Sequence, residues 1–430
     1  MRNCIRFLFV AAAVAAALMG PGTAGADTVT QWNAIASTAI VATAGQTPQA
    51  SALSFGMVQG AVYDAVNAID GGHRPYLLEP PAEPMDSKDA ATATAAFRVL
   101  VGFADLPGLF PTQQPILQPL YDTSLAAIPS GVAKEHGIAI GAAAARAMLA
   151  DRLGDGRGGL FAFAISSTPG AWRPTPPNFG VDPTAWVAFV RPFLVPDVEM
   201  LRTDGPNPLT SAAYAKDFNE VKELGSLTST RRTADQTKAA IFWQGPAIAM
   251  WNAVARSLVA SHGLGIVDSA RLFAMEDLAA ADASIGCWND KAHWNFWRPI
   301  TAIHEADTDG NPATVADPDW KPLFDPSTPT NGTPLVTPPF PDHPSGHSCN
   351  SSAILHTLHN FFGTDKMAFD VQSPRFPGYA RHFTRFSEAL REIIGARVWG
   401  GIHFRTADEQ GAVLGKKVAH YLRRHYFQPS

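Results

Sequence analysis

The chain has 430 residues, of which 46% are hydrophobic and 17% are charged, and its formal net charge is −5. The hydrophobic share excludes a wholly disordered chain, and the lack of a basic excess argues against a protein that binds nucleic acid. The charged fraction is below the ~25% of an average soluble protein, which predicts that much of the chain is buried or lies in neutral loops.

The N-terminus has the pattern of a secretory signal peptide. Arg2 and Arg6 precede an apolar, Ala-rich stretch over residues 7–19, and Ala24-Gly25-Ala26 matches a cleavage site. We therefore predict a signal peptide over residues 1–26 and a secreted or periplasmic mature chain that forms one all-α domain over residues 27–430. The alternative is a membrane anchor, although no later stretch reaches the ~18 apolar residues that a transmembrane helix needs.

Hydrophobic spacing predicts that most of the chain is helical. Apolar residues recur three or four positions apart in Ala-rich segments, and a capping box at residues 233–236 indicates a helix start. Residues 305–343 contain nine prolines, too many for a regular element. The predicted helices cover residues 53–69, 90–103, 113–128, 132–153, 233–263, 268–294, 347–362, 381–398 and 407–427. No stretch alternates long enough to predict a sheet, so the expected class is mainly α, a compact multi-helix protein.

Lys291 and Arg298 lie among aromatic residues near the end of one predicted helix. They are seven residues apart, which is two helical turns, so both side chains can face the same side. Pro299 ends the helix there. The aromatic neighbours are Trp288, Trp294, Phe296 and Trp297. The structural alternative is that both cations extend over this aromatic surface with their charged heads in water.

Ser345-Gly346-His347 opens the helix that follows the proline-rich segment. The first N–H groups of a helix are unpaired and carry partial positive charge, so an anion is well placed there. Ser345 could equally serve only as an N-cap. His343 and His347 have the spacing of zinc ligands, but Pro344 and the helix start between them disrupt a shared face, which argues against zinc.

Arg397 falls on the apolar stripe of a later helix, eleven residues after Phe386. A guanidinium on a buried face is costly unless it is paired, and an ion pair with a carboxylate is its structural alternative. Gly400-Gly401 breaks the helix, and residues 406–409 form a capping box for the next one. His403 is therefore expected in the short connection between two helices, with its side chain directed to the same site as that of Arg397.

Together the three segments predict one oxyanion pocket within residues 233–427. Lys291, Arg298 and Arg397 are cations without obvious partners nearby in sequence, and an oxyanion would satisfy all three. Ser345, the N–H of Gly346 and the two histidines His347 and His403 complete such a pocket.

The motifs K-x6-R-P, P-S-G-H and R-x5-H, in this order, resemble those of the vanadium-dependent haloperoxidase and type 2 phosphatidic acid phosphatase superfamily. The resemblance implies a mainly helical fold of two four-helix bundles. It also implies that vanadate is the cofactor, with His403 bonded to vanadium or, in a phosphatase, phosphorylated, and with His347 as general acid and base. The groups that would hydrogen-bond the oxygens of the anion are Lys291, Arg298, Ser345, Gly346 and Arg397. Phosphatase members often carry Asp four residues after the last histidine; here Ala407 takes that place and Asp408 follows it, which leaves open the group that orients His403.

Phe340 and Trp288 match the aromatic residues that border the halide site in the vanadium chloroperoxidases. An apolar, dry wall raises the energy of a halide ion and suits its oxidation. The expected function is therefore a secreted vanadate-dependent haloperoxidase, which uses hydrogen peroxide to oxidise chloride or bromide to hypohalous acid that can react with an organic substrate. Lys291 is expected to polarise an oxygen of the peroxide.

Two other functions fit parts of this pattern. One is an acid phosphatase that works through a phospho-histidine at His403. The other is a secreted protein that only binds phosphate or vanadate, against which His347 argues because binding alone needs no acid or base.

Cys287 and Cys349 are the cysteines that remain after removal of residues 1–26. Cys287 lies one helical turn before Lys291, and Cys349 lies two residues after His347. If Lys291 and His347 line one pocket, the cysteines are within reach of each other, and we predict a disulfide between them.

Overall fold

The computed structural model describes residues 27–106, 113–330 and 332–430, so the predicted signal peptide lies outside the described residues. The α-helices are α2 (Thr28–Ser37), α3 (Pro48–Asp70), α4 (Lys88–Gly102), α5 (Gln114–Ala126), α6 (Val132–Asp151), α7 (Ala212–Leu224), α8 (Ala234–Phe242), α9 (Ala247–His262), α10 (Ile266–Trp294), α11 (Pro299–His304), α12 (Gly346–Phe362), α13 (Phe386–Trp399) and α14 (Arg405–His425). Shorter helical turns are η1 (Thr38–Thr43), η2 (Phe103–Asp105), η3 (Ala185–Phe189), η4 (Val198–Leu201) and η5 (Ala306–Thr308). The predicted mainly helical class is confirmed.

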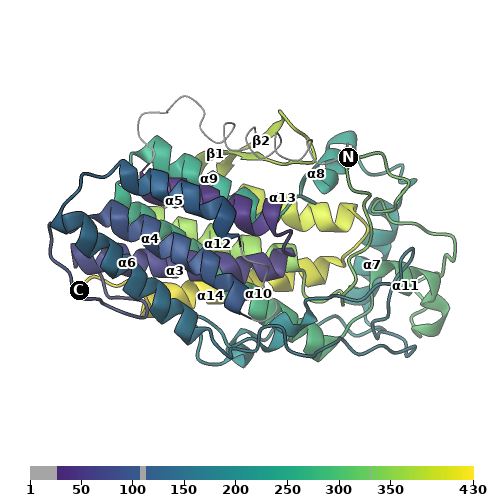
Figure 1. Ribbon diagram of the computed structural model, residues 1–430. Helices are drawn as coiled ribbons and strands as arrows, with labels where there is room; N and C mark the ends of the chain where they lie inside the picture. Colours follow the sequence, from purple (N-terminus) through teal and green to yellow (C-terminus); the bar gives the residue numbers. More distant parts are fainter. Residues whose placement is uncertain (1–26, 107–112, 331) are drawn as a thin grey trace, which may run out of the picture.

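Helix α10 is shared between two groups of helices (Figure 1). On one side α3 packs along it, with α4 and α6 packed on α3 and on each other, and with α2 and α5 on α4. On the other side α12 and α14 pack against α10, and α13 packs on both. Almost every residue of α10 from Ser269 to Lys291 is buried, as expected of a helix enclosed by neighbours. No described helix is both long and apolar enough to cross a membrane.

Two glycines on α14 set how closely this helix approaches α12. A Cβ atom at Gly415 would lie 2.3 Å from the carbonyl oxygen of Cys349, and one at Gly411 would lie 2.8 Å from that of Ser345. Because no other residue leaves this space empty, α14 lies directly against the backbone of α12. The start of α12, which carries Gly346 and His347, is thereby held in place.

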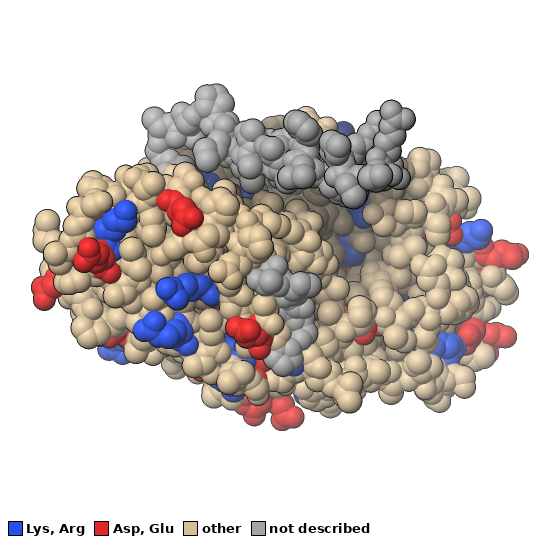
Figure 2. Space-filling view, in the orientation of Figure 1, with Lys and Arg blue, Asp and Glu red and all other residues tan. Residues whose placement is uncertain are grey.

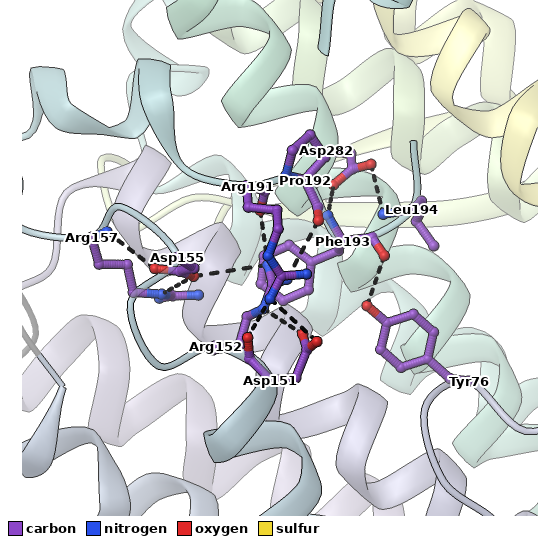
Figure 3. A network of polar contacts seen from close by, with 10 residues as sticks. All are labelled: Tyr76, Asp151, Arg152, Asp155, Arg157, Arg191, Pro192, Phe193, Leu194 and Asp282. Carbon is purple, nitrogen blue, oxygen red and sulfur yellow. Dashed lines mark hydrogen bonds and ion pairs between the residues drawn. The ribbon is translucent and has the colours of Figure 1, made fainter. Parts of the chain in front are cut away.

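A buried polar network fixes the chain over residues 191–195 to the first group of helices (Figure 3). Asp282 of α10 accepts hydrogen bonds from the backbone N–H groups of residues 193–195 at 2.5, 2.9 and 2.9 Å. Arg152, just beyond α6, donates to the carbonyl oxygen of Arg191 at 2.8 Å, and its guanidinium lies 4.2 Å from the centre of the Phe193 ring. Asp64 of α3 binds the N–H groups of residues 76–78 in the same way.

The structure contains one β-hairpin that the sequence analysis missed. Strands β1 (Lys366–Gln372) and β2 (Ala380–Arg385) pair antiparallel, so the helix predicted over residues 381–398 begins only at Phe386. In β1, alternate residues are buried, and they pack onto the helices through Met367, Phe369 and Val371. The alternation is short, and that is why the strand escaped notice.

Two predicted helix boundaries are also wrong. The helix predicted over residues 233–263 is broken into α8 and α9 around Gly245-Pro246, because proline has no N–H to continue the helical ladder. Helix α14 begins at Arg405 rather than at a capping box from Thr406. The Thr406 hydroxyl donates to Asp217 of α7 instead, so this hydrogen bond links α14 to α7.

Figure 2 shows a face on which charged side chains are sparse and uncharged residues predominate. The face is hollowed between the helical bundles and the loop-rich end that carries α7 and α11, and Lys or Arg atoms are visible in the hollow.

Candidate active site

A cavity of about 170 Å³ lies where the starts of α3, α9 and α12 meet the end of α13. Its lining residues are Pro48, Gln49, Gln244, Ala247, Trp288, Pro338, Phe340, Gly346, His347, Asn350, Arg397 and His403. The structure thus brings together six of the residues that the sequence predicted for the site. The other three, Lys291, Arg298 and Ser345, lie immediately behind this lining, as their contacts show.

Lys291 holds the loop over residues 338–345, which we call the proline loop. Its ammonium group donates to the carbonyl oxygens of Pro341, Asp342 and Pro344 at 2.7, 3.0 and 2.5 Å. The side chain is fully buried, and burial, with Arg298 close by, lowers its pKa to about 8. Lys291 therefore shapes the loop and contributes its charge to the site from behind the loop.

Arg298 joins the proline loop to His403. Its Nε donates to the carbonyl oxygen of Phe340 at 2.8 Å and its Nη1 donates to that of Ile402 at 2.7 Å. The same Nη1 lies 3.1 Å from Nε2 of His403. Burial lowers the pKa of Arg298 only to about 10, so the guanidinium stays charged at neutral pH beside the imidazole.

Asp342 is a site residue that sequence reasoning missed. Its Oδ1 lies 2.8 Å from Nδ1 of His403 and 4.0 Å from Nη1 of Arg298, and the carboxyl group is fully buried. Asp408, the nearest acid to His403 in sequence, instead accepts a hydrogen bond from Ser348 at 2.7 Å. The signal available in the sequence was an acidic residue two positions before the P-S-G-H motif and five positions before His347.

Both site histidines are neutral. The pKa of His403 is held well below its usual value by burial and by the charges of Arg298, Lys291 and Arg397. The pKa of His347 is likewise held well below its usual value by burial and by Arg397. A neutral imidazole has one nitrogen with a lone pair, so each of these side chains can bond a metal centre or accept a proton.

Several buried polar atoms around the cavity lack a partner among the described residues. They include Nη2 of Arg298, Nε of Arg397 and Nε2 of His347. Ser345 occupies the N-cap position of α12, but its side chain caps no N–H group. Leaving a buried donor unpaired costs about 1–3 kcal/mol, and an oxyanion at the start of α12 would satisfy the two guanidinium donors together. The residues present therefore fit vanadate.

Trp288 and Phe340 form an aromatic wall beside the proline loop. Their ring centres lie 5.1 Å apart. The centre of the Phe340 ring lies 5.1 Å from the Lys291 ammonium and 5.0 Å from the Arg298 guanidinium. The indole N–H of Trp288 donates to Asp182 at 2.7 Å. Asp182 belongs to no recognisable motif, so this contact could not be predicted from the sequence.

The predicted disulfide between Cys287 and Cys349 is wrong, because both cysteines are free thiols. They are buried and lie side by side, and burial together with the Cys287 thiol raises the pKa of Cys349. The Cys287 sulfur is directed at the carbonyl oxygen of Pro344, 3.6 Å away. The helices do meet here as expected, but the two thiols pack between them without forming a disulfide.

Comparison with known proteins finds similarity to vanadium haloperoxidases. A family model for the VCPO second helical-bundle domain matches residues 271–429. The vanadium chloroperoxidase of Curvularia inaequalis is 28% identical over 232 residues, which cover 42% of this chain and 37% of that protein. The chain thus matches little more than a third of the length of this curated relative.

Solved structures of similar fold extend over most of the chain. A bacterial vanadium-dependent iodoperoxidase matches with a TM-score of 0.76 at 22% identity, over 92% of this chain and 96% of that one. The apo form of a bacterial vanadium-dependent chloroperoxidase matches with a TM-score of 0.67 at 16% identity, over 88% and 94% of the two chains. At these identities the structural matches establish the fold.

Proposed function

We propose that the chain belongs to the superfamily of vanadium-dependent haloperoxidases and type 2 phosphatidic acid phosphatases and that it is a haloperoxidase that binds vanadate at His403. It would use hydrogen peroxide to oxidise a halide ion to the hypohalous acid. The observation that carries this proposal is the cavity itself: unpaired cationic donors and two neutral histidines surround it, and Trp288 and Phe340 form one wall.

Different residues around the cavity would bind different parts of vanadate. His403 would bond to vanadium, while Arg298, Arg397, Ser345 and the N–H of Gly346 would bind the oxygens of vanadate. Bound vanadate would supply a Lewis-acid centre that binds peroxide and makes one of its oxygens electrophilic. The buried charge of Lys291, behind the proline loop, strengthens the attraction for the anion because charges interact strongly in a dry interior.

His347 and the aromatic wall serve the reaction with peroxide and halide. His347 is neutral and has an unpaired Nε2, so it can accept the proton that peroxide loses and return it later. Trp288 and Phe340 keep water from a halide ion, which raises the energy of the ion before it attacks the peroxide oxygen.

The experiment that tests this proposal assays the purified protein with orthovanadate, hydrogen peroxide and, in separate reactions, chloride, bromide or iodide. Halogenation of an organic acceptor that depends on vanadate supports the proposal, and the halide that reacts fastest defines the specificity. The His403→Ala variant is the control, because loss of the vanadium ligand should abolish activity. Lack of vanadate-dependent oxidation of any halide would contradict the proposal.

A phosphatase is the second candidate, because phosphate is tetrahedral like vanadate and the unpaired donors suit both. The nucleophile would be Nε2 of His403, which would carry the phosphoryl group. Hydrolysis of a phosphate ester in vanadate-free buffer, inhibited by added vanadate, would favour this function over halide oxidation.

We also propose that the mature protein is secreted or periplasmic and begins near Asp27. The support is the charged, apolar and small-residue pattern of residues 1–26. Expression of the full chain in a bacterium, followed by mass determination of the protein outside the cytoplasm, should give a mass that lacks these residues.

A further inference from the structure

We propose that Asp182 is a positioning residue for the wall of the cavity, which holds the side chains of Trp288 and Gln49 with their N–H groups directed out of the cavity. Trp288 lies near the end of α10 and Gln49 at the start of α3, and both line the cavity, whereas Asp182 is not part of the lining. The Asp182 carboxylate therefore acts on the cavity through these two side chains. The purpose of this role rests on the proposed function, but the contacts can be measured without any ligand.

The Asp182 carboxylate accepts hydrogen bonds from donors in three parts of the chain. Its Oδ2 accepts from the indole N–H of Trp288 at 2.7 Å, and both of its oxygens lie 3.3 Å from Nε2 of Gln49. Its Oδ1 also accepts from the backbone N–H and the hydroxyl of Thr184 at 2.8 and 2.7 Å. The residue is only 7% exposed. A carboxylate has about four lone-pair sites and no donor, so it suits a place where only donors converge.

The segment that carries Asp182 is bound to α10 at a second point. Residues 185–188 of η3 are buried, and the carbonyl oxygen of Ala188 accepts from the side-chain amide of Asn289 at 3.0 Å. Trp288 and Asn289 are consecutive residues, so α10 binds this segment at Asp182 and again at Ala188. The carboxylate is therefore held in a fixed place relative to the indole.

The indole ring is oriented by its two ends. Its N–H meets Asp182, while the carbon edge of its six-membered ring is directed at the start of α12, where a Cβ atom at Gly346 would lie 3.0 Å from Cζ3. The wall thus presents carbon rather than a donor to this end of the cavity. Without the carboxylate, the N–H groups of Trp288 and Gln49 would be left without this acceptor, which is unfavourable, and would turn toward water or toward an anion in the cavity.

The first test follows the indole N–H of Trp288 by NMR, in the full chain with ¹⁵N-labelled tryptophan and no ligand. The signal is identified by its loss in Trp288→Phe. In wild type we expect slow exchange of this hydrogen with solvent, and in Asp182→Ala a shifted signal that exchanges at least about tenfold faster, because the protecting hydrogen bond is gone. Fast exchange in wild type, or an unchanged signal in Asp182→Ala, overturns the proposal.

The second test measures orthovanadate binding and the steady-state oxidation of bromide or iodide, whichever wild type oxidises faster. Donors that turn into the cavity would stabilise the bound halide, so Asp182→Ala should lower kcat about tenfold and lower KM for the halide as well. The dissociation constant for orthovanadate should change less than about twofold. Asp182→Asn keeps one acceptor oxygen, and its kcat should lie between the two. An unchanged kcat, a raised KM, or a loss of vanadate affinity as large as the loss in kcat would contradict the role.

The matched control is Asp64→Ala, which removes another buried carboxylate that binds backbone N–H groups, those of residues 76–78, and no residue of the cavity lining. It should destabilise the fold but leave the indole signal and the halide kinetics unchanged, whereas the same changes in this variant would show a general effect of destabilisation and contradict the proposal. If wild type oxidises no halide, the proposed function fails, while the exchange of the indole hydrogen still decides whether Asp182 holds Trp288.

Discussion

The site concentrates three buried cations, and each of them is stabilised by neutral acceptors. Lys291 is 0%, Arg298 0% and Arg397 1% exposed. Lys291 and Arg298 bind backbone carbonyl oxygens, and Arg397 donates to the side-chain oxygen of Gln244 at 3.1 Å. Carbonyl dipoles solvate the cations without cancelling their charge. Asp342 lies 4.0 Å from Arg298, but three cations against this one acid leave positive charge available to an anion in the cavity.

The affinity for vanadate should depend on pH through Lys291. Since burial lowers its pKa to about 8, the ammonium is charged below this pH and loses its charge as the pH rises through it. Lys291→Gln should therefore weaken orthovanadate binding about tenfold, or ~1.4 kcal/mol, at pH 6–7, and the difference from wild type should vanish above about pH 9. Titrations of both proteins at each pH measure it. The exposed Lys216 supplies the control, Lys216→Gln, and a difference that persists at high pH would contradict the assignment.

Variants of the two site histidines should affect vanadate binding and turnover differently. His403→Ala should abolish vanadate binding and halide oxidation together. His347→Ala should slow turnover by ~10²–10⁴-fold while orthovanadate still binds, since its role is proton transfer. Equilibrium dialysis and steady-state rates distinguish the two cases, and retained halogenation in His403→Ala would refute the roles.

At the scale of elements, helices with a clear apolar stripe were predictable and features set by tertiary contact were not. The predicted 268–294 helix matches α10 closely, because its Ala-rich sequence favours a helix locally. Thr406 looked like a cap, but its hydroxyl is bound by Asp217 of α7, which is distant in sequence. The cysteines were correctly judged to be neighbours, yet the direction of a thiol depends on packing that spacing does not report.

Loop attachment by buried carboxylates gives a prediction about stability. Asp282→Ala removes the acceptor of three backbone N–H groups, and hydrogen bonds to a charged group contribute ~1.5–3 kcal/mol each. Allowing for relaxation, we expect a loss on the order of 3 kcal/mol in the free energy of unfolding, measured by denaturant titration. Asp197→Ala, which loses one exposed hydrogen bond to Glu199, should cost far less. Equal losses would show that residues 193–195 are held by other contacts.

At the scale of the whole molecule, the site joins segments from both halves of the chain. The motif residues from 288 to 403 were found from sequence because each motif is compact. Gln49, at the start of α3, and Asp182 were not, since only the fold brings them to the cavity and to Trp288. Asp342 lies two residues before the P-S-G-H motif, but only the fold brings it to 2.8 Å from His403.

Because the cavity lies between several helices, an anion bound there should stabilise the whole fold. Orthovanadate at a hundredfold excess over its dissociation constant should add ~2.7 kcal/mol to the free energy of unfolding, which raises the melting temperature by a few degrees. Phosphate should compete for the same effect. Thermal unfolding at a fixed scan rate measures it, and an equal rise in His403→Ala would place the anion elsewhere.

Gly415 and Gly411 have no functional group, yet the spacing of the pocket depends on them. A methyl group at position 415 would clash with the backbone of α12. It would therefore displace the start of this helix, which carries Gly346 and His347. Every residue that faces the anion would nevertheless be unchanged. The geometry of the pocket therefore depends partly on residues that do not contact the anion. Attempts to retune this scaffold for an oxyanion of different size would do better to begin at the α12–α14 contact than at the arginines.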